Sequence, residues 1–235
     1  MILLLFPLSE ACMPADATNS VTIDGNTYVC VTIQPLKFNS SGTYLRQSSV
    51  VKADNFTAIN IKGAWNSTAW SSDAVMTKLG VKEAASYGIG VTVESMGIIS
   101  YRRIYRYYDS EYGKITYPLL MAIITVEKGT VTSINWDGGC SFCETSKCTS
   151  SVYNYQGEVL STLGNACFVQ DNVGCLSPDG TSQTNSLCAL NVYVVWTGTD
   201  SKGNNFMSSA SRFSRLDPTQ MTTITGSLMA LASSY

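Results

Sequence analysis

Short runs of β-branched and aromatic residues, separated by turn signals at close intervals, constrain the fold of this chain more than any other feature. In Val21–Ile33 two such runs flank Asp24-Gly25, which is the pattern of a tight hairpin. A second hairpin is predicted from Leu190–Thr199 and Asn205–Leu216. Further strands are expected at Ile89–Ile99, Tyr101–Tyr108, Lys114–Val126 and Val131–Trp136. A turn at Glu127–Thr130 is expected between the last two.

One short helix is expected among these strands. Ser71-Ser72-Asp73 has the residue types of a helix cap and precedes the helical pattern of Ala74–Tyr87. The whole pattern predicts a mainly β protein, an Ig-like antiparallel β-sandwich with one short helix and a disulfide-rich insert. Because no linker or repeat divides the chain, one domain is predicted over residues 12–235, with the Cys-rich insert at 137–188 and a donor-strand extension at 1–11.

The eight cysteines favour disulfides in an oxidising, extracellular compartment. Six of them crowd into the insert, and the predicted disulfide residues are Cys12, Cys30, Cys140, Cys143, Cys148, Cys167, Cys175 and Cys188. Cys12 and Cys30 are a candidate pair, while the other six permit fifteen pairings. In a cytosolic protein the Cys140-x-x-Cys143 array followed by Cys148 would suggest zinc; a disulfide-knotted loop is favoured here.

Composition argues against most enzyme and nucleic-acid classes. Histidine is absent, which excludes His-based triads and His metal ligands. Charged residues make up 14% of the chain, with a net charge of −2, a poor profile for a nucleic-acid binder. No G-x-S-x-G motif or glycine-rich phosphate cradle is present. We therefore expect no enzymatic activity, no catalytic residue, no cofactor, no metal and no membrane span.

The first six residues form an uninterrupted apolar run: Met1, Ile2, Leu3, Leu4, Leu5 and Phe6. No basic residue precedes the run, Pro7 ends it, and secretory signals have an apolar stretch of roughly 7–15 residues. Ser9-Glu10-Ala11 has the small-x-small pattern of a cleavage site, so a clipped signal is the alternative. If the run belongs to the working protein, its side chains need burial, and we interpret it as an assembly strand that fills an acceptor groove.

Three N-glycosylation sequons are clustered, at Asn39, Asn55 and Asn66. Tyr101–Tyr108 interleaves basic and aromatic residues; an interface or glycan-contact role is favoured over binding of single-stranded nucleic acid. Trp65 and Trp70 flank the Asn66 sequon and are candidates for a sugar-stacking site, although core packing is the favoured interpretation. Trp196 lies in an apolar strand and is expected in the core.

An apolar segment followed by a β-sandwich resembles the subunits of donor-strand-exchange fibres such as bacterial pili. The cysteine-rich loop and the Ser211-Arg212-Phe213-Ser214-Arg215 stretch are also similar to glycosylated extracellular fibrils of aquatic microbes. The resemblance implies a structural subunit of an extracellular, cell-surface helical filament, whose partners are other copies of itself and which carries N-linked glycans. The alternative is a secreted monomeric carbohydrate-binding module.

Overall fold

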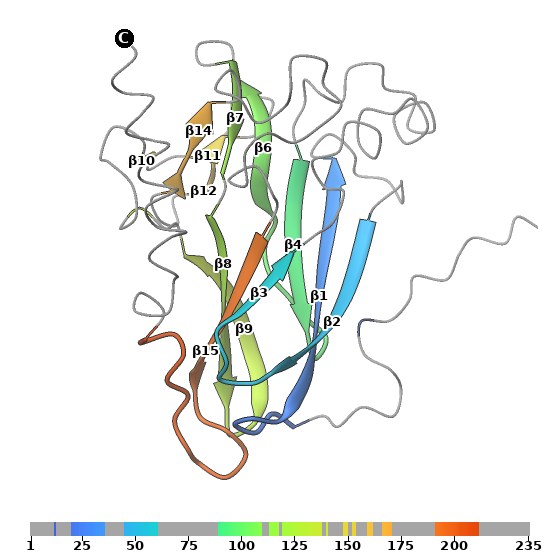
Figure 1. The fold of residues 1–235 in the computed structure, drawn as a ribbon, viewed down its shortest axis with the longest axis vertical. Helices are drawn as coiled ribbons and strands as arrows, with labels where there is room; N and C mark the ends of the chain where they lie inside the picture. Colours follow the sequence, from blue (N-terminus) through green and yellow to red (C-terminus); the bar gives the residue numbers. More distant parts are fainter. Residues whose placement is uncertain are drawn as a thin grey trace, which may run out of the picture.

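A computed structural model describes residues 12, 20–35, 45–60, 89–109, 113–117, 119–137, 140, 148–149, 152–153, 159–161, 166–170 and 191–211. Within these ranges the chain is mainly β, and its two larger sheets pack face to face (Figure 1). The predicted β-sandwich is therefore confirmed. The predicted helix and the apolar run Met1–Phe6 lie outside the described residues.

The larger sheet has seven strands. Along its main path each strand pairs antiparallel with its neighbour, in the order β14 (Val169–Gln170), β7 (Gly113–Thr116), β6 (Arg103–Asp109), β4 (Ile89–Ser95), β1 (Asn26–Pro35) and β2 (Leu45–Lys52). The short strand β5 (Ile98–Ile99) pairs with β4 off this path. The order β6-β4-β1-β2 places residues from distant parts of the sequence side by side.

The smaller sheet has four strands, in the order β3 (Thr57–Asn60), β15 (Asn191–Gly198), β8 (Leu119–Glu127) and β9 (Thr130–Asp137). Strands β8 and β15 are parallel from Leu119↔Asn191 to Val126↔Gly198. The other strand pairs of this sheet are antiparallel. The sandwich is thus antiparallel with one parallel pair, which the sequence pattern does not predict. Parallel neighbours need a long crossover, and here it includes the cysteine-rich insert.

The core lies between the two sheets and follows the period of two along each strand. Val29, Val31 and Ile33 of β1 belong to the same buried cluster as Val192, Val194 and Trp196 of β15. Trp196 is fully buried and its ring lies 6.1 Å from that of Phe206, so the prediction that Trp196 is a core residue is confirmed. Burial of each such side chain contributes about 1.5–3 kcal/mol, which makes this seam the main source of stability.

The turn predicted at Glu127–Thr130 is confirmed. Lys128 and Gly129 both have positive φ, 50° and 82°, and join β8 to β9 as a two-residue hairpin. The predicted strand Lys114–Val126 is divided instead into β7 of the larger sheet and β8 of the smaller. The chain passes from one sheet to the other between Thr116, where β7 ends, and Leu119, where β8 begins.

The predicted hairpin over Val21–Ile33 is wrong. Residues 21–23 are not a strand; Asp24 and Gly25 turn the chain into β1, whose partners are β2 and β4. The backbone N–H of Val21 instead donates to the Gly129 carbonyl, and its carbonyl accepts from Ser201. A turn signal specifies a local reversal but not the partner of the chain that precedes it.

The second predicted hairpin is wrong in its return strand. Leu190–Thr199 corresponds to β15, but of Asn205–Leu216 the described residues 205–211 form turns after a single bridge, Thr199↔Asn205. Two backbone bonds to β15 remain, from the Phe206 N–H to the Gly198 carbonyl and from the Ser209 N–H to the Trp196 carbonyl. Side chains add others: the Ser208 hydroxyl accepts from the backbone N–H of Trp196 at 2.7 Å. Asp54 Oδ1 accepts from the backbone N–H groups of Met207 and Ser208, both at 2.7 Å.

Described strands of the predicted insert are short. They form two small two-stranded sheets, β10 (Cys148–Thr149) with β13 (Ala166–Cys167) and β11 (Val152–Tyr153) with β12 (Val159–Ser161). Strand β14 joins this region to β7 at the edge of the larger sheet. Figure 1 shows these strands beside the upper part of β6 and β7, away from the loop that follows β15.

Candidate functional site

The Cys12–Cys30 disulfide fixes the segment upstream of β1 to the outer face of the larger sheet. The Cα atoms are 5.6 Å apart, and both residues are buried. Because Val29 and Val31 point into the core, Cys30 points to the opposite face. The Cys12 carbonyl accepts a hydrogen bond from the Ser48 hydroxyl at 3.4 Å, and its sulfur lies 3.6 Å from the Glu94 carbonyl oxygen. Cys12 therefore contacts β1, β2 and β4 together.

Arg46 and Glu94 form an ion pair beside this anchor. Arg46 Nη2 lies 2.6 Å from Glu94 Oε2, and about a fifth of each side chain is exposed. The pair reaches from β2 to β4 across β1. Partly exposed pairs of this kind contribute about 0–1 kcal/mol, so the covalent bond is the stronger restraint on the upstream segment.

The cysteines of the insert do not form a zinc site among the described residues. Cys140 bonds to Cys148 with a Cα separation of 5.5 Å, and Cys167 is also disulfide-bonded. Oxidised sulfurs cannot act as the thiolate ligands that zinc requires. In the described part of the chain no three Cys, Asp or Glu residues are grouped to hold a metal. Cys143, Cys175 and Cys188 lie outside it.

The aromatic and basic stretch Tyr101–Tyr108 is not a surface for stacking in its first half. Arg103 and Tyr105 of β6 are 2% and 0% exposed. Arg103 lies opposite the core residue Val91 of β4, so its side chain is on the face of the sheet that packs in the core. Ile104, on the other face of β6, is also fully buried. Arg102 is partly buried, and desolvation lowers the pKa of its guanidinium. Side chains of Arg106, Tyr107 and Tyr108 lie outside the description.

Arg103 is the most unusual polar side chain of the described core. None of its three guanidinium nitrogens makes a hydrogen bond of normal geometry. Desolvation lowers the pKa of Arg103, while the nearby Tyr101, Tyr117 and Asp137 groups oppose that shift by favouring the charged form. The cluster joins the two sheets, since Arg103 belongs to β6 and Asp137 to β9. Alternation with Tyr105 is the sequence signal that points Arg103 inward.

The candidate carbohydrate site receives no structural support. Trp65 and Trp70 lie outside the described residues, and Trp196 is buried in the core. Trp136 is 6% exposed and its indole N–H donates to the Tyr101 carbonyl at 2.9 Å. Both described tryptophans therefore pack inside the sandwich. Asn55 is the one sequon asparagine within the described ranges and it is exposed, whereas Asn39 and Asn66 fall outside them.

Strand β9 is an open edge of the smaller sheet. Among the described residues it pairs only with β8. Thr130, Thr132 and Asn135 are exposed, while Val131, Ile134 and Trp136 face the core. A register shift in the β8–β9 ladder leaves Thr132 unpaired, and Ser133–Asp137 then continue in regular register.

In the described chain no helix is long and apolar enough to cross a membrane.

A family model described as "Uncharacterised protein DDB_G0273449" matches residues 89–229, more than half of the chain. This chain belongs to that family. The family region begins at the first residue of β4 and continues beyond β15, so it includes β9 and the Arg103 cluster. Strands β1–β3 and the Cys12–Cys30 bond precede it, although β1 and β2 extend the larger sheet and β3 extends the smaller one. No curated protein and no solved structure matches the chain.

Proposed function

We propose that this protein is a structural subunit of an extracellular filament, in which the apolar segment Met1–Phe6 of one copy adds as a strand to the next copy. The open edge of β9 is the observation that carries the proposal. Strand addition supplies main-chain hydrogen bonds along an edge and pockets for alternate side chains. It suits an uncharged run of six apolar residues such as Met1–Phe6.

Strand β9 is a better acceptor than the other edges of the described sandwich. Proteins protect exposed edges with Lys, Pro, bulges or very short strands. The edge strand β2 carries Arg46 and Lys52, β3 has four residues, and β14 has two. Strand β9 has eight residues without Lys, Arg or Pro, and its protection is the irregularity at Thr132. The regular stretch Ser133–Asp137 is similar in length to the apolar run.

An exposed apolar side chain lies beside this edge. Strand β5 packs next to β9, and Ile99 of β5 is 61% exposed, among the most exposed large apolar residues of the described chain. A strand added to β9 would place alternate side chains toward this side of the sandwich. Burial of each of those side chains contributes about 1.5–3 kcal/mol before ordering costs. Edge pairing and apolar burial therefore favour the same position.

The disulfide anchor gives the donor segment a fixed origin. Six steps of extended chain from Phe6 to Cys12 span at most about 20 Å, at ~3.3–3.6 Å per residue. A donor patch on one copy and an acceptor edge elsewhere on the next make a heterologous contact, which propagates into a helical filament when it does not close. Buried disulfides at Cys12–Cys30 and Cys167 agree with maturation in an oxidising compartment, and extracellular location is part of the proposal.

Photo-crosslinking tests the acceptor edge directly. A benzophenone amino acid at exposed Asn135 of β9 is expected to crosslink to the peptide that contains Met1–Phe6. The same probe at exposed Ser201, in the loop after β15, is the control and should not. Mixing normal and nitrogen-15-labelled chains distinguishes crosslinks between two copies from crosslinks within one copy, since only addition between copies joins a labelled peptide to an unlabelled one. Crosslinks within one copy alone, or none from Asn135, would contradict the proposal.

A further inference from the structure

We infer that Asn55 is an N-glycosylation site and that its glycan covers the end of the sandwich where β2 passes into β3. This inference does not depend on the proposed filament. Asn55-Phe56-Thr57 is a sequon, with an asparagine two residues before a hydroxyl residue and no intervening proline. A sequon alone is a weak signal, and here the fold also presents these three residues in a way that suits glycosylation.

Asn55 lies in a turn and outside either ladder. Its backbone N–H donates to the Lys52 carbonyl at 3.1 Å, which closes the turn, and β3 begins two residues later at Thr57. The side chain of Asn55 is exposed, and its amide makes no hydrogen bond in the described structure. Attachment of a sugar to that nitrogen therefore breaks no contact of the fold.

The neighbouring residues hold the asparagine outward. The Phe56 ring packs on Tyr193 of β15 with 5.5 Å between centroids, which directs this residue toward the smaller sheet. Thr57 pairs with Val194, and its hydroxyl lies 3.4 Å from the Asn55 carbonyl oxygen as a donor. The middle residue of the sequon thus anchors the turn, while Asn55 remains accessible.

The reaction is transfer of an oligosaccharide from a lipid-linked diphosphate donor. The Asn55 amide nitrogen forms a bond to the anomeric carbon of the first sugar as the bond from that carbon to the diphosphate oxygen breaks. The amide loses one proton, and the lipid diphosphate leaves. The co-substrate class is found in secretory compartments, in agreement with the disulfides of this chain.

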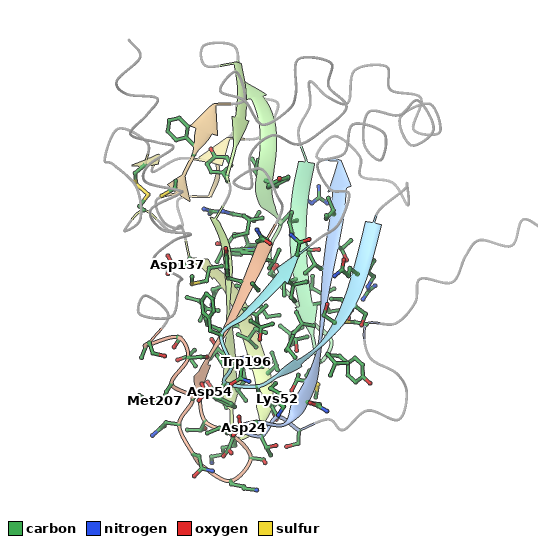
Figure 2. All side chains as sticks on the ribbon, viewed as in Figure 1. Asp24, Lys52, Asp54, Asp137, Trp196 and Met207 are labelled. Carbon is green, nitrogen blue, oxygen red and sulfur yellow. A yellow bond between two sulfur atoms is a disulfide. The ribbon has the colours of Figure 1, made fainter. Side chains whose placement is uncertain are left out.

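A glycan at Asn55 would shield Met207. Asp54, the preceding residue, accepts the Met207 N–H at 2.7 Å, and Met207 is 58% exposed. Figure 2 shows Asp54, Met207, Lys52 and Asp24 together at the lower end of the sandwich. A methionine thioether this exposed is expected to oxidise readily to the sulfoxide unless something covers it. The glycan would also lie where β2 and β3, the edge strands of the two sheets, meet.

Four variants secreted from eukaryotic cells test the inference. Peptide mapping with and without glycosidase is expected to find glycan at Asn55 in the wild type and in Thr57→Ser, which preserves the sequon. It should find none at residue 55 in Asn55→Gln or Thr57→Val. Asn60→Gln, an exposed asparagine outside any sequon, is the control and should retain the glycan. An unmodified Asn55 in the secreted wild type overturns the site.

Oxidation of Met207 tests the shielding separately. In dilute peroxide, Met207 should form sulfoxide several-fold faster in Thr57→Val than in Thr57→Ser, and circular dichroism should show the same fold for both. Equal rates would overturn the shielding even if Asn55 carries the glycan. Glycosidase treatment of the folded wild type should raise the rate to that of Thr57→Val, which excludes an effect of the substitution itself.

Discussion

At the level of single residues, Arg103 places a charged guanidinium in the core, and none of its nitrogens makes a hydrogen bond of normal geometry there. Its guanidinium is almost fully buried among Tyr101, Tyr117 and Asp137. A buried charge that lacks good hydrogen bonds costs desolvation free energy, and an apolar residue of similar volume in its place removes that cost. The side chain fills space that any replacement must also fill.

Arg103→Met is therefore expected to keep the free energy of unfolding within about 1 kcal/mol of the wild type, or to raise it. Arg103→Ala should lower it by about 2–5 kcal/mol, because a cavity remains. Urea unfolding followed by tryptophan fluorescence measures both. A loss in Arg103→Met as large as that in Arg103→Ala would show that the guanidinium itself is bound tightly.

Asp200 gives a second residue-scale prediction, in the dependence of stability on pH. Burial alone would raise its pKa, but hydrogen bonds donated by Asn204, Lys202 and Ile23 outweigh it and hold the pKa below its ordinary value. Because the folded pKa is the lower one, this carboxylate stabilises the fold above its unfolded pKa. The contribution is lost as pH falls through the folded pKa.

Asp200→Asn should therefore be less stable than the wild type at neutral pH, and the difference should shrink as pH falls below about 4. Denaturant midpoints over this pH range measure it. Lys202→Ala is the matched control, because Lys202 contributes only its backbone N–H to Asp200 and its side chain is exposed. A stability difference that stays constant with pH would contradict the assignment.

At the level of elements, the sequence predicts strands better than it predicts their partners. Ile89–Ser95 and Thr130–Asp137 are strands because β-branched and aromatic residues fit a half-buried pleated surface, which is a local property. The predicted strand Ile89–Ile99 is divided by a turn at Met96-Gly97 into β4 and β5. The pairing of β8 with β15 joins residues about 70 positions apart, and nothing local specifies it. After β15 the described residues 206–211 form turns, held by two backbone bonds to β15 and by the side chains of Asp54 and Ser208, and no local pattern in the sequence specifies these contacts.

The same distinction applies to the candidate site. Pairing of Cys12 with Cys30 could be proposed from the sequence because these two cysteines stand apart from the other six. The position of β9 at the edge of its sheet could not be predicted from the sequence, because edges depend on the order of strands in a sheet. Arg103 appears as part of an exposed basic stretch until the register of β6 against β4 is known.

The Cys12–Cys30 bond gives the prediction at this scale. The double substitution Cys12→Ser with Cys30→Ser should lower the free energy of unfolding by roughly 3 kcal/mol, because it opens a loop of 18 residues. The same double substitution should also make the peptide bonds near Cys12 susceptible to limited proteolysis, while the strands from β4 to β9 stay protected. Unchanged stability with unchanged cleavage would show that Ser48 and Glu94 hold the segment without the disulfide.

At the scale of the whole molecule, a β-sandwich presents an open edge while a covalently anchored apolar segment lies upstream of it. The family region from residue 89 onward contains β9, the proposed acceptor strand, and the residues before it contain the proposed donor segment Met1–Phe6 and the Cys12–Cys30 bond. This division predicts that loss of the donor leaves the sandwich folded, because Met1–Phe6 would be buried in another copy.

Assembly of the full chain through its first residues is the most direct test of the proposed filament. Negative-stain imaging and sedimentation velocity should show filaments for the wild type. A variant lacking residues 1–7, and the full-length Leu3→Asp with Leu5→Asp variant, should sediment as monomers with the same circular dichroism as the sandwich. Filaments of normal morphology from either variant, or a wild type that remains monomeric at high concentration, would contradict the account.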